Sequence, residues 1–283
     1  MLELYRSYAD LAEDIACWSQ TLPDEIVAVS GIPRSGIIPA MMLAAHRNVS
    51  YVPWEILTRG ETPWTYGDTR GVNRPDLGIV LVVDDTSFSG RTIVMLRRCL
   101  PPRDNGVYYR FGAVYAGPDG QRKVDFWHKE LRTVYHTFQW NILQDALSPK
   151  IMVDMDGVLC ENWNKPDTND YAASHYEHLQ FAKPLLLPSW PIMGVVSSRL
   201  EKFRPETEAW LNRHNVQRAF VELHPAATHE ERAVMGAWKF KAETYAGNPD
   251  VMLFIESEPE DSQQIAIASG KPVLCWKNQK VYR

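Results

Sequence analysis

Cysteine is scarce in this 283-residue sequence. The four cysteines, Cys17, Cys99, Cys160 and Cys275, are widely spaced, and no two of them form a CxxC pair. This spacing gives neither a disulfide framework nor a dithiol redox motif. We therefore expect free thiols, buried in apolar segments, in a reducing compartment.

Long apolar runs are also lacking, since none approaches the roughly 20 residues that a membrane-spanning helix needs. The segment after Met1 leads directly into amphipathic sequence and does not resemble a signal peptide. The formal net charge of −5 gives no general attraction to nucleic acids or anionic membranes. We therefore expect a cytoplasmic protein with no membrane association and no general nucleic-acid binding.

The remaining composition is that of a globular protein, with 45% hydrophobic and 23% charged residues. The length is sufficient for two domains of ordinary size, each with its own core.

The most informative stretch is residues 79–92, IVLVVDDTSFSGRT. Five apolar residues, four of them β-branched, predict a strand buried on both faces of a parallel sheet. Asp84 and Asp85 follow at its carboxyl end, where open α/β sheets bind their ligands. A loop with several hydroxyls and Gly90 then leads into a helix predicted over residues 92–100.

These residue types suit a ligand with two different ends. The loop hydroxyls and the amino end of a helix offer donors to a phosphate group. Two adjacent carboxylates repel a phosphate but suit vicinal hydroxyls or a magnesium ion. A molecule that carries both a phosphate and a diol is a ribose 5-phosphate.

The stretch resembles the phosphoribosyl-pyrophosphate (PRPP) signature of type I phosphoribosyltransferases, in which an apolar strand precedes two acidic residues and a Ser/Thr–Gly–x–Thr loop. The resemblance implies that PRPP binds here and that a loop after an earlier strand, residues 31–36 (GIPRSG), binds its pyrophosphate. The implied PRPP-binding residues are Arg34, Ser35, Gly36, Asp84, Asp85, Thr86, Ser87, Ser89, Gly90, Arg91 and Thr92.

Two further segments have alternative interpretations. Residues 58–76 lack periodicity, and such a long loop is either functional or a solvated linker. Arg59, Arg70 and Arg74 are candidates for screening the charge of departing pyrophosphate.

Aromatic residues cluster in residues 124–140. They either fill the core or stack on a base, and Phe138 and Trp140 are the candidates for base stacking.

A second motif begins at residue 150, KIMVDMDGVLC. A strand leads to Asp154, and Asp156 and Gly157 follow. The pattern resembles motif I (DxDGV) of haloacid dehalogenase-like (HAD) phosphatases, in which the first Asp attacks phosphorus and the second acts as general acid and then base. Because two anions repel, a Mg²⁺ must sit between the attacking carboxylate and the phosphate.

The later motifs of the HAD family follow in order. The resemblance implies that Ser197 hydrogen-bonds the phosphoryl group and that Lys241, rather than Lys239, is the expected lysine. Ser257 stands where a metal-binding Asp is typical, so Glu256 would bind the metal with Glu258 or Asp261. The implied catalytic residues are Asp154, Asp156, Ser197 and Lys241, and the implied magnesium ligands are Asp154, Asp156, Glu256 and Asp261.

Residues 161–190 separate the first two HAD motifs and are too few for a large cap domain. Within them, His175 and His178 could suggest a metal site. With no matching Cys or His nearby, we interpret both as surface residues of a short helix.

The sequence thus predicts an α/β fold of two Rossmann-like domains, each a mainly parallel sheet flanked by helices. The boundaries are 1–149 for a phosphoribosyltransferase-like domain and 150–283 for a HAD-like phosphatase domain with a minimal cap. The implied function is a bifunctional, Mg²⁺-dependent enzyme of nucleotide metabolism. It would transfer phosphoribosyl to a nucleobase-like acceptor from PRPP, or run in reverse from a ribonucleotide with pyrophosphate, and it would hydrolyse phosphate monoesters.

Two departures from the family patterns keep an alternative open. Phe88 stands where several phosphoribosyltransferases carry an Asp that can serve as a base, and Ser257 replaces a metal ligand. The alternative is a domain that senses PRPP or a nucleotide and regulates a HAD phosphatase, without transferase turnover. Relatives of the first domain often form dimers, so a homodimer is a further expectation.

Overall fold

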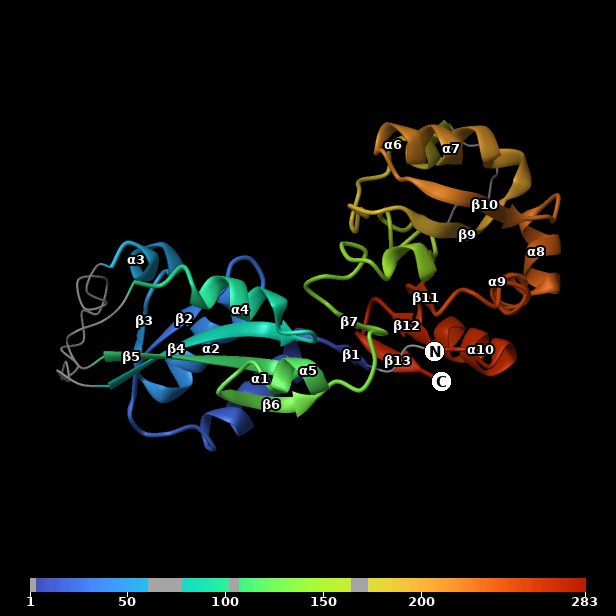
Figure 1. Ribbon diagram of the computed structural model, residues 1–283. Helices are drawn as coiled ribbons and strands as arrows, with labels where there is room; N and C mark the ends of the chain where they lie inside the picture. Colours follow the sequence, from blue (N-terminus) through green and yellow to red (C-terminus); the bar gives the residue numbers. More distant parts are fainter. Residues whose placement is uncertain (1–3, 61–77, 102–106, 164–172) are drawn as a thin grey trace. The chain divides into compact units, whose positions relative to one another are not determined.

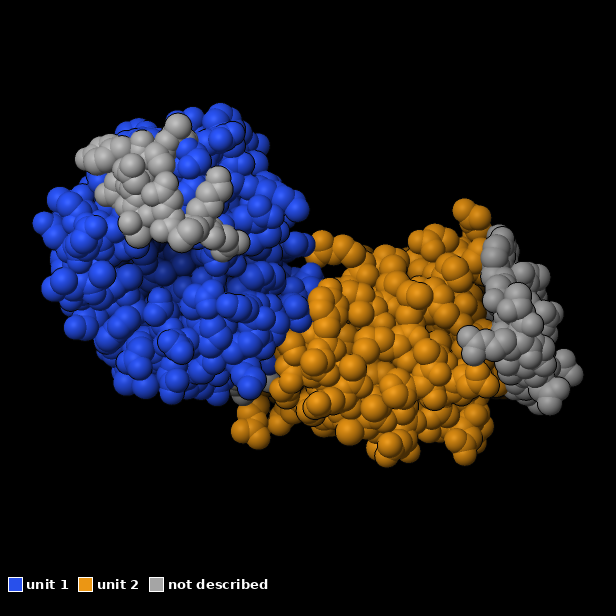
Figure 2. Space-filling model, turned by 180° about the vertical axis from the view of Figure 1, so that it is seen from behind, with its two compact units in different colours: residues 1–5, 137–283 blue, residues 6–136 orange. Residues whose placement is uncertain are grey.

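The computed structural model describes residues 4–60, 78–101, 107–163 and 173–283. The chain forms two compact units (Figure 2). Unit 2 is Arg6–His136, and unit 1 is Thr137–Arg283 together with the N-terminal residues through Tyr5. The sequence predicts a boundary at residues 149 and 150, whereas the units divide between His136 and Thr137. The reason is that Ile142, Leu143 and Leu147 pack into the core of unit 1.

The described part of unit 2 is built on a five-stranded sheet with the order β3-β2-β4-β5-β6, in which every neighbouring pair is parallel. The strands are β2 (Ile26–Gly31), β3 (Ser50–Tyr51), β4 (Gly78–Ser87), β5 (Val107–Ala116) and β6 (Phe126–Glu130). Strand β4 is longer than the sequence predicts, because it continues through Asp84 and Asp85 in register with β5.

Helices cover both faces of this sheet (Figure 1). They are α1 (Tyr8–Ser19), α2 (Ile37–Arg47), α3 (Trp54–Thr58), α4 (Arg91–Arg97) and α5 (Pro118–Gln121). Val80 and Val82 share a core with residues of α3 and α4. Leu81 points the other way, because successive side chains of a strand alternate between faces; it lies with Trp18 of α1 against Gly112. Helix α4 is shorter than the predicted 92–100.

The order of the strands creates a switch point in unit 2. The chain passes from β2 to β3 on one side and then returns to β4 on the other side of β2. The loops after β2 and β4 therefore lead away in opposite directions, and open α/β sheets bind ligands at such a switch point. These loops are the two with the phosphoribosyltransferase-like motifs.

Unit 1 has a second, six-stranded sheet with the order β10-β9-β8-β11-β12-β13. All pairs are parallel except β12 with the edge strand β13. The strands are β8 (Ile151–Val153), β9 (Ile192–Leu200), β10 (Arg218–His224), β11 (Leu253–Glu256), β12 (Val273–Cys275) and β13 (Lys280–Tyr282). The switch point of this sheet lies between β8 and β11.

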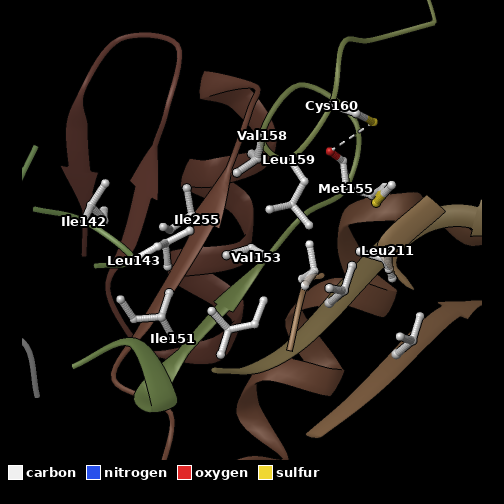
Figure 3. Close-up of a cluster of buried hydrophobic side chains, with 14 of the residues drawn as sticks. Ile142, Leu143, Ile151, Val153, Met155, Val158, Leu159, Cys160, Leu211 and Ile255 are labelled. Atoms are coloured by element: carbon white, nitrogen blue, oxygen red, sulfur yellow. Dashed lines mark hydrogen bonds between the residues drawn. The ribbon is translucent and has the colours of Figure 1, made fainter. Parts of the chain in front are cut away.

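Successive side chains of β8 point to opposite faces of the sheet and contribute to the two cores of unit 1. Ile151 and Val153 join Leu143, Leu211 and Ile255 on one face (Figure 3). Met152 joins residues of α9 and α10 on the other. The helices of the unit are α6 (Ala173–Phe181), α7 (Arg204–Arg213), α8 (His229–Met235), α9 (Ala237–Ala246) and α10 (Pro259–Ser269), with short 3-10 turns η2 (Ser148–Lys150) and η3 (Glu201–Phe203).

A short sheet of β1 (Leu4–Arg6) and β7 (His136–Phe138) contains both points where the chain passes between units. Two mainly parallel sheets flanked by helices confirm the predicted α/β class.

The prediction for the thiols is right only in part: all four are free, but Cys17 and Cys99 are exposed while Cys160 and Cys275 are buried. Among the described helices, none is long and apolar enough to cross a membrane.

A buried carboxylate fixes α1 on the sheet of unit 2. Asp14 is 4% exposed, accepts a hydrogen bond from Tyr115 Oη at 2.7 Å and pairs with Lys129 on β6. Burial alone would raise the pKa of Asp14, but contacts with His128, Lys129 and Tyr115 outweigh it and lower the pKa to about 2.

We expect Asp14→Asn to lower the free energy of unfolding of unit 2 by about 2 kcal/mol at neutral pH, the equivalent of the lowered pKa. Because the folded-state pKa is depressed, this contribution is present above the ordinary pKa of 3.8 and is lost as the pH falls toward 2. Hydrogen exchange of the α1 amides in the full chain, at neutral pH and at about pH 3, measures it.

The control is Asp119→Asn, since the side chain of Asp119 is 76% exposed. A difference between Asp14→Asn and wild type that grows as the pH falls would contradict this account of Asp14.

Candidate functional site

The switch point of unit 1 opens into a pocket of about 340 Å³. Its wall contains Asp154, directly after β8; Ser197, in β9; Glu256, at the end of β11; and Lys241, from α9. These residues come from four separate motifs of the sequence. The parallel strands bring Asp154, Ser197 and Glu256 together because the carboxyl ends of the strands meet at one edge of the sheet. Lys241 reaches the same place from α9.

A buried ammonium group joins two carboxylates at the centre of this pocket. Lys241 Nζ lies 2.8 Å from Asp154 Oδ2 and 2.7 Å from Glu256 Oε2, and all three residues are at least 96% buried. Burial and the charge of Glu256 raise the pKa of Asp154 well above its usual value, against the opposing effect of Lys241. Lys241 has a raised pKa because the two carboxylates outweigh the effect of its burial. Asp154 is therefore a carboxylate whose ionisation depends on nearby positive charge.

Asp156 has a different environment. Both of its oxygens accept hydrogen bonds from Arg199, at 2.8 Å from Nε and 2.7 Å from Nη2, and His178 Nε2 lies 3.5 Å away. Burial opposes ionisation, but Arg199 and His178 outweigh it and hold the pKa of Asp156 far below its usual range. The two aspartates of the DxDG motif thus have pKa values shifted in opposite directions.

The turn that follows the two aspartates depends on Gly157. Its φ is +80°, and a Cβ atom at this position would lie 2.5 Å from Cβ of Ser257. Both features exclude a larger residue without distortion. The turn therefore brings the motif against the loop after β11.

The loop after β11 and the first turn of α10 hold the remaining predicted acidic residues. Asp261 lines the pocket, and burial and Glu256 raise its pKa. Glu258 also lines it but pairs with Lys277 at 2.9 Å. Ser257 donates a hydrogen bond from its hydroxyl to Glu256 Oε1 at 3.2 Å.

The four predicted magnesium ligands are not arranged as one set. Within the described residues, no three His, Cys, Asp or Glu side chains are grouped as a metal site. Arg199 donates a hydrogen bond to each oxygen of Asp156. The Asp156 side chain is therefore engaged by Arg199 and is not a favourable magnesium ligand in this arrangement. Asp154 and Glu256 are the pair of carboxylates that shares one partner.

The prediction that His175 and His178 are surface residues is wrong. Both lie on α6 and line the pocket, and His175 is only 8% exposed. The reason is packing against aromatic rings from other parts of the chain. The ring centroid of Trp163 lies 5.2 Å from that of each imidazole, and the ring centroid of Phe203 lies 5.1 Å from that of His175. Sequence reasoning also missed His229 and Arg232 of α8, which line the same pocket.

In unit 2, the two predicted PRPP loops meet at the switch point. A Cβ atom on Gly36 would lie 2.6 Å from the carbonyl oxygen of Val83 and 3.0 Å from Cα of Asp84. Only glycine allows this approach, which places the loop after β2 against the acidic end of β4. Ile32 N–H donates to the Val83 carbonyl at 2.8 Å and fixes the contact.

The acidic pair is buried at this point. Asp84 is 8% and Asp85 4% exposed, and burial together with the charge of Asp85 raises the pKa of Asp84 well above its usual value. The side-chain hydroxyls of Thr86 and Ser87 are buried, and neither has a hydrogen-bond partner among the described residues. Such groups are costly to leave unpaired, so a polar ligand would stabilise this loop.

The other predicted residues of this site are more open. Arg34, Ser89, Arg91 and Thr92 are exposed, Ser35 is half-buried, and the Pro33–Arg34 peptide bond is cis. Gly90 has a φ of +71°. Arg59 is exposed at the end of α3, while Arg70 and Arg74 lie outside the described residues.

Phe138 and Trp140 belong to unit 1, not to the unit with the PRPP-like loops. They are 3% and 9% exposed and stack on each other, with ring centroids 4.8 Å apart. Their faces pack within the protein, so the structure does not favour these two residues as a base-stacking pair.

Comparisons with solved structures find similarity over about half of the chain. A purine phosphoribosyltransferase from Pyrococcus horikoshii is 19% identical, with a TM-score of 0.36, over 50% of this chain and 94% of that one. A xanthine-guanine-hypoxanthine phosphoribosyltransferase from Helicobacter pylori is 16% identical, with a TM-score of 0.35, over 49% and 94%. An orotate phosphoribosyltransferase from Aeropyrum pernix is 19% identical, with a TM-score of 0.29, over 44% and 71%. No family model matches the chain.

We expect Lys241→Met to lower the free energy of unfolding of unit 1 by about 3–5 kcal/mol at neutral pH, because it leaves two buried carboxylates without their shared counter-charge. The loss shrinks in acid, where protonation of Asp154 removes the repulsion. Hydrogen exchange of the β8 and β11 amides in the full chain measures it.

Lys239→Met is the matched control, since Lys239 is exposed on the same helix. Equal stability of the two variants would mean that Lys241 does not compensate the charge of Asp154 and Glu256.

Proposed function

We propose that unit 1 hydrolyses phosphate monoesters, with Asp154 as the nucleophile. The observation that carries this proposal is the placement of Asp154, Lys241 and Ser197 around one pocket at the switch point of the sheet. A carboxylate, an ammonium group and a hydroxyl together can attack phosphorus and bind the phosphoryl oxygens.

The reaction would proceed in two displacements. An oxygen of Asp154 forms a bond to phosphorus as the ester P–O bond breaks, and the departing alkoxide takes a proton. A water molecule then attacks the aspartyl-phosphate, which releases phosphate and restores the carboxylate. Asp156 would exchange these protons. Its pairing with Arg199 favours the ionised form, which can accept a proton from water, and it must take up a proton before it can donate to the alkoxide.

The donor chemistry of the pocket fits a magnesium ion. Mg²⁺ is commonly held by one or two carboxylates together with waters and substrate phosphate oxygens, and Asp154 and Glu256 form such a pair. Burial and the charge of Glu256 raise the pKa of Asp154. When bound, magnesium would supply positive charge that favours the ionised, nucleophilic form of Asp154.

We expect Asp154→Asn to reduce phosphate release from simple monoesters with Mg²⁺ by about a thousandfold or more, because an amide cannot form the acyl phosphate. A phosphate-release assay over a panel of monoesters measures this. Asp250→Asn, at an exposed position, is the control. Turnover in Asp154→Asn equal to wild type would refute the nucleophile, and a wild type inactive on every monoester would refute the proposed hydrolase.

We propose a second activity in unit 2: phosphoribosyl transfer between PRPP and a nucleobase-like acceptor, in either direction. The specific support is the meeting of Gly36, the acidic pair and the unpartnered hydroxyls of Thr86 and Ser87 at the second switch point. Asp84 and Asp85 would bind the ribose hydroxyls, residues 86–92 the 5-phosphate, and Arg34 the pyrophosphate. Phe88 offers no proton acceptor, so the acceptor base must react without help from that position.

Two separately measured products test this second activity. With Mg²⁺, PRPP and a panel of bases, we expect pyrophosphate release that persists in Asp154→Asn but falls at least about a hundredfold in Asp85→Asn, because the acidic pair orients the ribose. PRPP that binds tightly without pyrophosphate release from any base would instead identify a sensor domain. Neither binding nor release would refute a PRPP site in unit 2.

A further inference from the structure

The pocket of unit 1 contains a cation and a hydrogen-bonding imidazole that the proposed hydrolysis does not use. Asp154 and Glu256 share Lys241, and Asp156 is paired with Arg199. Arg232 and His175 also line the pocket, from α8 and α6, and have no role in the two displacements. We refer to Arg232 and His175 together as the second subsite.

Arg232 lacks a charged partner. It is half-buried, and its Nη1 donates to the carbonyl oxygen of Ser198 at 3.0 Å. Within the described parts of the chain it forms no ion pair, although Asp156 is near enough to affect it electrostatically. A partly desolvated guanidinium without a carboxylate partner is unfavourable, and an anionic ligand removes that cost. The planar fork of an arginine suits phosphate and carboxylate groups in particular.

His175 has an unsatisfied nitrogen in the same region. The residue is 92% buried, and its Nδ1 has no hydrogen-bond partner among the residues that the structure describes. Contacts of its ring with Trp163 and Phe203 fix its orientation. A buried imidazole nitrogen without a partner, on a residue that lines a pocket, is a candidate hydrogen-bonding group for a ligand.

The second subsite lies beside Asp156. His178, three residues after His175 on α6, has its Nε2 3.5 Å from Asp156, and the charge of Asp156 affects both His175 and Arg232. In the proposed mechanism, Asp156 exchanges a proton with the leaving-group oxygen. The groups around Asp156 therefore face the alcohol part of the substrate, not the phosphate that is transferred.

We propose that Arg232 and His175 bind a second anionic group on the alcohol part of the substrate. The preferred substrates of unit 1 are then phosphate monoesters that also carry a phosphate or a carboxylate, and Arg232 is the specificity-determining residue. This inference rests on the proposed phosphatase function of unit 1 and adds a substrate class to it.

Matched pairs of substrates test the inference on the full chain with Mg²⁺. Glycerol phosphate is compared with phosphoglycerate, which adds a carboxylate, and fructose monophosphate with fructose bisphosphate, which adds a phosphate. For wild type we expect kcat/KM to be at least about tenfold higher for the member with the second anion, mainly through a lower KM, as for a hydrogen bond to a charged group. The pair with the larger ratio identifies the preferred second anion.

In Arg232→Gln we expect this ratio to fall about tenfold, and in Arg232→Lys, which keeps the charge but loses the fork, to fall less. Arg213→Gln is the matched control, because Arg213 is exposed on α7. Its ratio should equal that of wild type.

The possible failures are distinguishable. A wild type inactive on all four compounds contradicts the proposed hydrolase itself. A wild type that hydrolyses both members of each pair equally well overturns the second subsite, whether or not the Arg232 variants fold. Equal losses on both members of a pair in Arg232→Gln also overturn it, because they would show that Arg232 only maintains the pocket.

Discussion

The site of unit 1 depends on one buried ammonium group. Lys241 lies on α9, while its two carboxylate partners end β8 and β11. Because an unpaired buried charge is far more costly than a paired one, the position of α9 on the sheet and the positions of the two strand ends determine each other. The folding of this unit therefore assembles the pocket, in which burial and the charge of Glu256 raise the pKa of Asp154.

Both units use the same solution to place acidic groups. In each, two strands that are neighbours in the sheet lead their chains in opposite directions. Carboxylates lie near the carboxyl end of β4 in unit 2, and at the ends of β8 and β11 in unit 1. The outcome differs with the surrounding charge. Asp84 has another acid beside it, whereas Asp154 has both an acid and an ammonium group. The first environment is consistent with the ribose hydroxyls proposed for unit 2, and the second with the phosphate and magnesium ion proposed for unit 1.

The sequence predicts the strand ends because their signals are local. An apolar run followed by acids, as at residues 79–85 and 150–156, specifies strand and site in a few residues. The environment of His175 and His178 could not be predicted in this way, because Trp163 and Phe203, which bury them, are set by tertiary packing. The boundary between the units could not be predicted for the same reason. Residues 137–149 carry no strong sequence pattern, and they belong to unit 1 because they pack into the core that contains Ile151. The mutual pairing of Asp156 and Arg199 also joins residues that the sequence separates widely.

The two proposed activities constrain each other through charge. Transfer of phosphoribosyl to an uncharged base produces a nucleotide with one phosphate, which would leave Arg232 and His175 without a ligand. A nucleotide of an acidic base, or a sugar with two phosphorylated positions such as PRPP itself, would occupy both parts of the pocket. Hydrolysis of that nucleotide is effectively irreversible and would pull the proposed transfer in unit 2 forward, whereas hydrolysis of PRPP would remove its donor. If unit 1 hydrolyses the product of unit 2, the charge of the second subsite favours an acidic base as the acceptor of unit 2. If unit 1 instead hydrolyses the donor, PRPP is the compound that both units bind.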